Sequence, residues 1–155
     1  MGGGGGRRDL GSRRRRKEPH ASNLRAGRVS TPGQTYSITK CCASGDRQII
    51  PDPFAPLNSA ENADAIISSL LWLQKRDRIT CYGYVIMPDH IHFMMKLGDV
   101  ASLSEVMRSF SGHTAKAINR MNGWVGTFWL EGYYEHAIRD NRAFDRHLNY
   151  LACRF

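Results

Sequence analysis

The stretch Tyr84–Leu97, which reads YVIMPDHIHFMMKL, decides the fold. Pro88 and Asp89 interrupt two β-rich segments that are close enough in sequence to pair as an antiparallel hairpin. Successive side chains of a strand point to opposite faces, so we expect His90 and His92 on one face. The other face then carries the apolar residues Ile91, Phe93, Met95 and Leu97.

The two histidines have two interpretations. Neutral imidazoles side by side on a rigid strand form half of a site for a divalent metal ion. The alternative is a pair of polar residues on the solvated face of an edge strand. The spacing of His90 and His92 alone does not separate these interpretations.

The rest of the chain supplies the other elements of a mixed domain. We expect further strands over residues 35–42 and 133–138. Helices are expected from Ser59 or Asn62 to about Arg76, from the capping box at Ser102, and from Asp140 to about Cys153. The order strand, helix, strand, strand, helix, strand, helix predicts an α+β fold. Its core is a ferredoxin-like or RRM-like antiparallel sheet with helices packed on it.

Apolar residues at helical spacing predict the buried stripes of the first two helices. The first stripe is Ala65, Ile66, Leu70, Leu71 and Leu73. The second is Leu103, Val106, Met107, Phe110, Ala117, Ile118 and Met121.

The last helix carries a second reactive group. Its apolar stripe consists of Phe144, Leu148 and Leu151. At about 100° per residue, Tyr150 lies roughly 110–120° from the centre of that stripe, on the same side as His147. A tyrosine beside polar groups can act as a covalent nucleophile. The alternative is ordinary amphipathic packing.

Charge is concentrated in one segment of the 155-residue chain. Residues 1–30 hold nine basic and two acidic side chains and a five-glycine run, whereas the other 125 residues hold 13 basic and 12 acidic ones. We therefore expect a disordered basic tail over residues 1–30 and one domain over residues 31–155. The tail is either an arm that attracts phosphate backbones or a solvated leader, and both interpretations stay open.

A stripe of basic residues follows the second helix. Arg108, Lys116 and Arg120 are spaced in multiples of four and line up on one face, where they could bind a phosphate backbone. The alternative is a solvated helix face.

The four cysteines contain no C-x-x-C pair, which disfavours a zinc knuckle and suits a reducing compartment. With no apolar run of membrane-spanning length and no signal-peptide pattern, we expect a cytoplasmic protein.

The histidine segment also carries a family resemblance. The sequence VIMPDHIHFMMKL resembles the His-hydrophobic-His motif of the single-tyrosine transposases, and most of all that of the REP-associated tyrosine transposases of the insertion-sequence-200-like superfamily. Further segments agree in order and type, and the resemblance covers roughly residues 30 to 155. These segments are residues 32–39, residues 102–107 with Asn119 and Arg120, and residues 128–140.

The resemblance implies a transposase, a DNA strand transferase that nicks and rejoins single-stranded, hairpin-bearing DNA. It implies that Tyr150 attacks the phosphate and forms a 5′-phosphotyrosine link, and that His90 and His92 hold Mg²⁺ or Mn²⁺. It leaves open whether the chain works as a monomer or as a homodimer.

The sequence departs from the family pattern near its end. The family has Asn or Gln four residues after the tyrosine as a third metal ligand, whereas this chain has Arg154, which has no acceptor atom. The family's continuation beyond this point is also absent, so we expect a C-terminally truncated relative. The alternative function is therefore a catalytically weak or inactive relative that only binds single-stranded or hairpin nucleic acid. A metal-dependent hydrolase unrelated to nucleic acid is a third hypothesis.

Overall fold

The computed structural model describes residues 30–43 and 55–152. Within them a four-stranded antiparallel sheet has the order β2-β3-β1-β4. Its strands are β1 (Thr35–Cys41), β2 (Ile79–Met87), β3 (His90–Leu97) and β4 (Tyr134–Ile138). This order and the alternation of strands and helices confirm the predicted ferredoxin-like α+β architecture.

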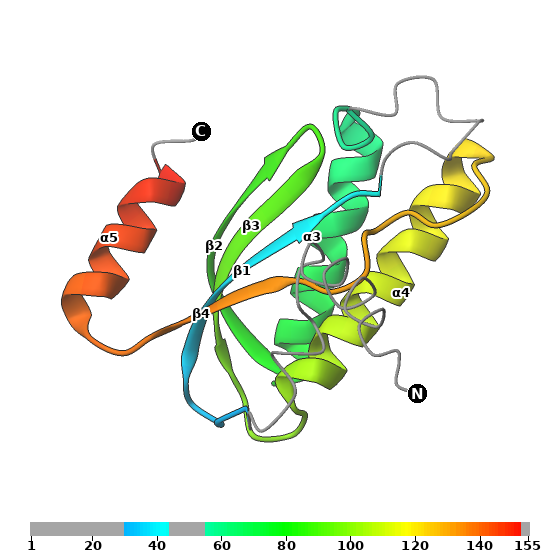
Figure 1. Ribbon diagram of the computed structural model, residues 1–155. Coiled ribbons are helices and arrows are strands. Elements are labelled where there is room, and N and C mark those ends of the chain that lie inside the picture. The colour runs from blue at the N-terminus through cyan, green and yellow to red at the C-terminus, as the bar shows by residue number, and fades with distance from the viewer. Residues whose placement is uncertain (1–29, 44–54, 153–155) are drawn as a thin grey trace, which may run out of the picture.

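Two helices cover one face of the sheet and a third lies on the other (Figure 1). The helices α3 (Ala60–Lys75) and α4 (Leu103–Asn122) lie together on the first face, and α5 (Asn141–Ala152) lies on the second. No helix within residues 30–43 and 55–152 combines the length and apolarity that a membrane crossing requires.

The predicted hairpin is confirmed. β2 pairs with β3 from Met87 opposite His90 to Ile79 opposite Leu97, so Pro88 and Asp89 form the turn. On the other side, β3 pairs with β1, which places Thr39 opposite His92. β3 is therefore a central strand, and the proposed edge position of the two histidines is wrong.

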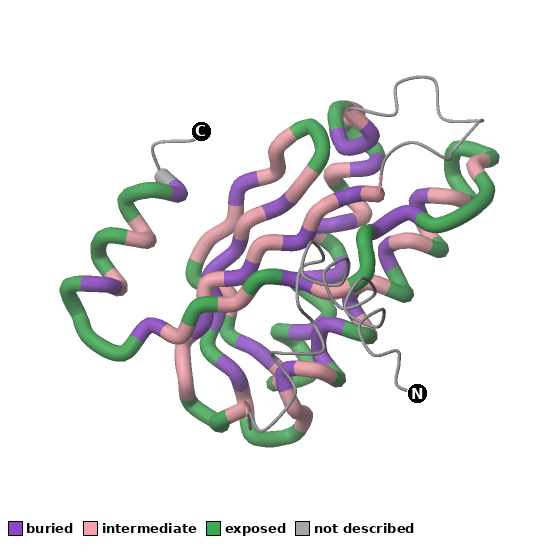
Figure 2. The backbone as a smooth tube through the Cα atoms, in the orientation of Figure 1, coloured by how far each residue is buried: buried purple, intermediate pink, exposed green. Residues whose placement is uncertain are grey.

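The main core lies between the sheet and the pair α3 and α4. The four apolar residues predicted on one face of β3 are all buried there, together with Phe110 and Ile118 of α4. A smaller apolar cluster lies under α5 and contains Val85, Met94, Ile138, Ala143 and Leu151. Figure 2 shows buried segments in all the strands, as expected for a sheet that is covered on both faces.

Local signals begin the helices where the sequence places them. The Ser59 hydroxyl accepts a hydrogen bond from the Asn62 amide, and Ser102 and Glu105 form the predicted capping box of α4. The Asp140 carboxylate accepts a hydrogen bond from the Ala143 amide at 2.7 Å at the start of α5. The ends of the strands differ from the prediction by one residue, at Cys41 and Tyr134.

Two predicted core residues are exposed. Leu71 is 54% exposed, because α3 contacts the sheet through Ile66, Leu70 and Leu73 and the next residue after Leu70 turns away by about 100°. Met121 is 51% exposed on the last turn of α4, which lies away from the strands in Figure 1. The basic tail, the loop over residues 44–54 and the end from Cys153 onward lie outside the described residues.

A buried lysine joins β1 to the segment before β4. Lys40 is 4% exposed, and its Nζ donates hydrogen bonds to the carbonyls of Leu130 (2.7 Å) and Gly132 (2.6 Å). Burial lowers the pKa of Lys40 to about 8, although the nearby Cys41 and Glu131 act in the opposite direction. The charged form therefore costs free energy in the folded state.

The stability contributed at Lys40 should rise with pH. Between pH 8 and about 10.5 the unfolded chain binds the lysine proton and the folded chain releases it, so the free energy of unfolding increases across this window. Urea unfolding at pH 7.5 and at pH 10 gives the free energy of unfolding of wild type and of Lys40→Met. The value for wild type should increase between these pH values by on the order of 1–3 kcal/mol more than the value for Lys40→Met. The same difference at both pH values would contradict this assignment.

Candidate active site

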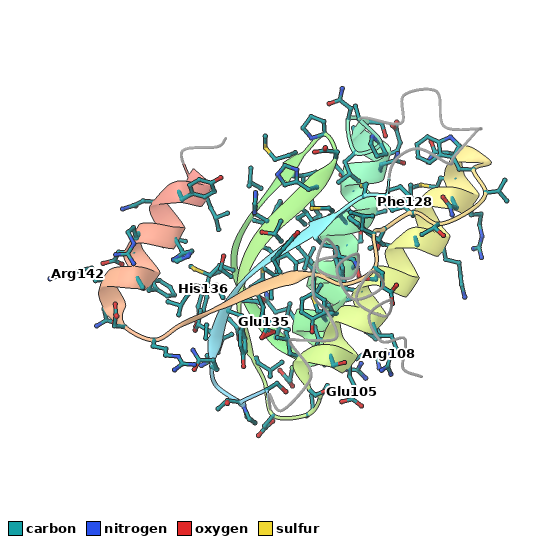
Figure 3. The ribbon with its side chains drawn as sticks, in the orientation of Figure 1. Glu105, Arg108, Phe128, Glu135, His136 and Arg142 are labelled. Carbon is teal, nitrogen blue, oxygen red and sulfur yellow. The ribbon has the colours of Figure 1, made fainter. Side chains whose placement is uncertain are left out.

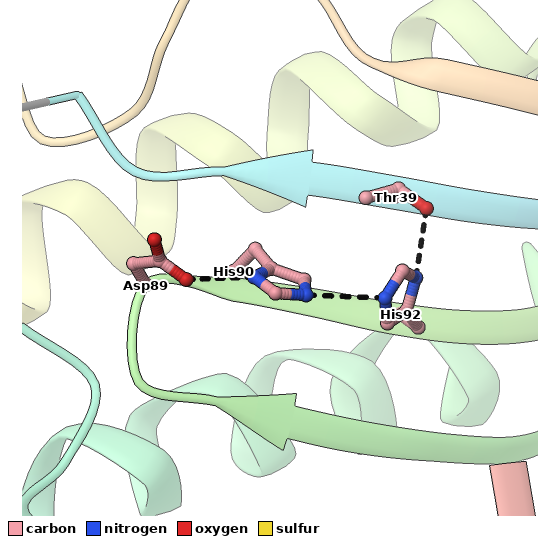
Figure 4. A network of polar contacts seen from close by, with 4 residues as sticks. All are labelled: Thr39, Asp89, His90 and His92. Atoms are coloured by element: carbon pink, nitrogen blue, oxygen red, sulfur yellow. Dashed lines mark hydrogen bonds and ion pairs between the residues drawn. The ribbon is translucent and has the colours of Figure 1, made fainter. Parts of the chain in front are cut away.

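The two histidines of β3 point their Nε2 atoms toward each other. Nε2 of His90 lies 3.1 Å from Nε2 of His92, and the ring centroids are 4.7 Å apart (Figure 4). Both side chains lie on the face of the sheet opposite α3 and α4, as the strand periodicity predicted. Each side chain is partly exposed.

A second polar group holds the far side of each ring. Nδ1 of His90 lies 2.7 Å from an oxygen of Asp89, and Nδ1 of His92 lies 2.8 Å from Oγ1 of Thr39 (Figure 4). When Nδ1–H donates to these oxygens, the lone pair of a neutral imidazole is on Nε2. The Asp89 carboxylate, which only accepts, favours this tautomer at His90, and the Thr39 hydroxyl, which can accept or donate, is compatible with it at His92.

The donor set fits a divalent metal ion. Two nitrogens bound side by side to one octahedral ion at about 2.1 Å would be about 3.0 Å apart, close to the observed 3.1 Å. The carboxylate and hydroxyl behind the rings are the partners that metal-binding histidines usually have. The convergence of His90 and His92 fits the predicted half-site, and their role as metal ligands stays a prediction.

Further protein ligands are scarce within the described residues. No group of three histidine, cysteine or acidic side chains there has metal-binding geometry. Cys41 lies opposite His90 on β1, and burial and then the charge of Asp89 raise the pKa of its thiol. Arg154, at the position of the family's third ligand, lies outside the described residues.

The phenol of Tyr150 lies beside this pair. Its ring centroid is 5.9 Å from that of His92, with the rings at 89°, and Tyr150 is 44% exposed. A groove of about 360 Å³ separates α5 from β1 and β3. It is lined by Ser37, Thr39, His92, Arg146, His147, Tyr150 and Leu151. The predicted nucleophile and one predicted metal ligand therefore share one groove.

Apolar packing sets the position of Tyr150. Leu151 is buried in the small cluster under α5, and Phe144 and Leu148 pack against it, which confirms the predicted stripe. A Cβ on Gly83 of β2 would lie 3.4 Å from Leu151 Cδ1 and 3.7 Å from Leu148 Cδ1. Gly83 therefore lies directly beneath Leu148 and Leu151 of α5, at a distance where a Cβ would make ordinary van der Waals contacts.

The basic stripe lies elsewhere. Arg108, Lys116 and Arg120 are exposed on α4, which covers the other face of the sheet. Figure 3 shows Arg108 on that helix and His136 between the sheet and α5. Arg108 lines a separate groove of about 700 Å³ that also reaches Lys40. The structure thus does not bring this stripe together with Tyr150, and its DNA-binding role stays a prediction.

Several groups of the site were not singled out from sequence. They are Thr39, Asp89 and Arg146, together with His136, whose ring stacks on that of His147 at 5.3 Å. The alternation of Ser37 and Thr39 in β1 gave a signal for one polar face, but only the strand pairing shows that this face adjoins His92.

Comparison with known proteins identifies the family. The family model described as "Transposase IS200 like" matches residues 57–152, more than half of the chain. The chain belongs to the IS200-like transposase family. No match was found among curated proteins.

Two solved structures share the fold of this IS200-like transposase. One is described as a REP-associated tyrosine transposase bound to a REP hairpin, with a TM-score of 0.59, 18% identity, and coverage of 80% of this chain and 67% of that one. The other is a putative transposase from Deinococcus radiodurans R1, with a TM-score of 0.52, 13% identity, and coverage of 77% and 89%. At these identities the likeness supports the fold.

The hydrogen bond between His92 and Thr39 should matter for metal binding. Thr39→Val keeps the shape of the side chain but removes the hydroxyl, so Mn²⁺ affinity measured by titration calorimetry should fall about tenfold to a hundredfold. His92→Ala should abolish binding at this site, and His113→Ala, which removes an exposed imidazole of α4, should leave it unchanged. Wild-type affinity in Thr39→Val would show that Thr39 does not orient the ligand.

Proposed function

We propose that this chain nicks and rejoins single-stranded, hairpin-bearing DNA through a covalent link to Tyr150, with Mg²⁺ or Mn²⁺ held by His90 and His92. The observation that carries the proposal is the 5.9 Å separation between the rings of Tyr150 and His92 across a solvent-accessible groove. A nucleophile and a cation site at this separation can both reach one phosphodiester group.

The chemistry follows from the two side-chain types. The phenol oxygen of Tyr150 forms a bond to phosphorus, and the bond from phosphorus to the 3′ oxygen of the DNA breaks. The phenol loses its proton and the departing 3′ oxygen gains one. A bound divalent ion supplies polarisation of the phosphate oxygens and lowers the barrier to attack. A DNA hydroxyl later reverses the link, so the number of phosphodiester bonds is unchanged and no ATP is needed.

The imidazole rings of His90 and His92 are held in position before a cation and a phosphate bind. Their rings are fixed from behind by Asp89 and Thr39, so little reorganisation is needed when a cation and a phosphate arrive. The small apolar cluster under α5 does the same for Tyr150. One of the similar structures is described as bound to a REP hairpin, which supports hairpin-bearing DNA as the substrate class of this chain.

A second candidate function is binding of the same nucleic acid without cleavage. The observation that favours it is the donor set, because only two converging nitrogens and no group of three candidate ligands lie within the described residues. A weakly held cation would lower the rate of attack without affecting the strand-binding surface. The two candidates differ in whether a covalent adduct forms.

A denaturing gel distinguishes them. Wild type incubated with a labelled single-stranded hairpin and Mn²⁺ should give a protein–DNA adduct that survives denaturation, and Tyr150→Phe should give none. Tyr82→Phe is the matched control, because Tyr82 is 37% exposed and packs on Phe144 of α5 without lining the groove. DNA binding without an adduct in wild type would favour the binding-only function, and an adduct in Tyr150→Phe would disprove the assigned nucleophile.

A further inference from the structure

The site face of the sheet continues past the catalytic groove toward β4. Thr39 lies opposite His92 on one side and opposite Tyr134 on the other, so these three side chains form one row across β3, β1 and β4. Directly opposed residues of an antiparallel sheet project from the same face. Ser37 and His136 occupy the next row of the same face. Tyr134 and His136 thus share the face of the metal half-site.

These two aromatic side chains of β4 are open to solvent. Tyr134 is 49% exposed, and His136 is exposed although its ring stacks on that of His147 from α5. Neither belongs to the apolar clusters that hold the fold together, whereas Ile138, the next residue on this face, is buried under α5. Burial thus gives no reason for a large aromatic ring at Tyr134.

The distance from Tyr134 to the reaction site suits a bound strand. Neighbouring strands lie about 4.8 Å apart, so the backbones at Tyr134 and His92 are about 10 Å apart. A DNA strand at the duplex rise of about 3.4 Å per nucleotide covers that distance in about three nucleotides, and an extended strand covers it in fewer. A strand whose phosphate lies at His92 and Tyr150 therefore reaches Tyr134 within a few nucleotides.

The charge of the groove beside Tyr150 is also complementary to such a strand. Arg146 of α5 contributes a cation to the groove wall. Among the described residues no carboxylate lines this groove, and its other polar lining groups are hydroxyls and imidazoles. A guanidinium is well suited to bind phosphate, and an exposed aromatic ring stacks on any nucleobase.

We propose that single-stranded DNA crosses the β1–β4 side of this face, with one base stacked on Tyr134 and a backbone phosphate held by Arg146. This proposal rests on the proposed function, because it places the strand relative to the reaction at Tyr150. His147 of α5 lines the groove, and its ring stacks on that of His136 of β4. This stack is a direct contact between α5 and β4. The surface reads no sequence, because every base has a π-face.

The test separates base stacking from phosphate contact. Full-length protein with Tyr150→Phe, which cannot form the adduct, is titrated with two fluorescent strands of equal length, one of thymidine and one with every base removed. Tyr134→Ala should weaken binding of the thymidine strand about fivefold to a hundredfold and leave binding of the abasic strand unchanged. Tyr134→Phe keeps the ring and should bind the thymidine strand within about twofold of the parent.

A phosphate contact by Arg146, unlike base stacking by Tyr134, should not depend on whether the strand carries bases. Arg146→Gln should weaken binding of both strands alike and reduce the slope of log affinity against log salt by about one. The matched control is Trp72→Leu, which removes an aromatic ring that is 40% exposed on α3, on the other side of the sheet. This change should leave both affinities at the parent value.

Three results would overturn the proposal. The first is parent-like binding of the thymidine strand by Tyr134→Ala. The second is an equal loss of affinity for both strands in that variant, which would indicate a structural or purely electrostatic role. The third is a loss in Tyr134→Phe as large as in Tyr134→Ala, which would contradict stacking. Failure of the proposed function has a different signature, since wild type would then form no adduct whatever the binding data show.

Discussion

The pairing of β3 between β1 and β2 is the constraint on which the rest of the structure depends. In this register the alternate residues from Ile91 to Leu97 fill the core under α3 and α4, and His90 and His92 face the opposite side. A slip by one residue would bury both imidazoles and expose the core residues, at a large cost in hydrophobic free energy. The same packing that stabilises the sheet therefore orients the two histidines.

The two faces of the sheet differ in how strongly they are covered. The large core joins α3 and α4 to the sheet, whereas α5 is held by a small cluster around Met94, Ile138 and Leu151. The position of Tyr150 thus depends on few apolar contacts. Substitutions in this cluster should affect the geometry of the phenol before they affect the stability of the sheet.

Periodicity in the sequence predicted the parts of the molecule that depend on one element at a time. The hairpin around Pro88, the face of the two histidines and the apolar stripe of α5 follow from local patterns, and the structure confirms them. Convergence of Tyr150 with His92 came from the family resemblance, because no local pattern relates two elements so far apart in sequence. The roles of Thr39 and Arg146 also require the strand order and the placement of α5. Leu71 and Met121 show the limit of this approach, because both were predicted to be buried and both are exposed. Helical periodicity predicts the direction in which a side chain points, but it does not predict whether a neighbouring element covers it.

The central claim is that two imidazoles and one phenol surround a single cation and phosphate position. Paramagnetic broadening of side-chain NMR signals by Mn²⁺ tests it most directly, because the effect falls steeply with distance from the ion. We expect low Mn²⁺ to broaden the ring signals of His90, His92 and Tyr150 together, while those of Trp72 and His113 on the other helices stay sharp. Broadening of the histidines without Tyr150, or at residues across the sheet alone, would contradict this arrangement.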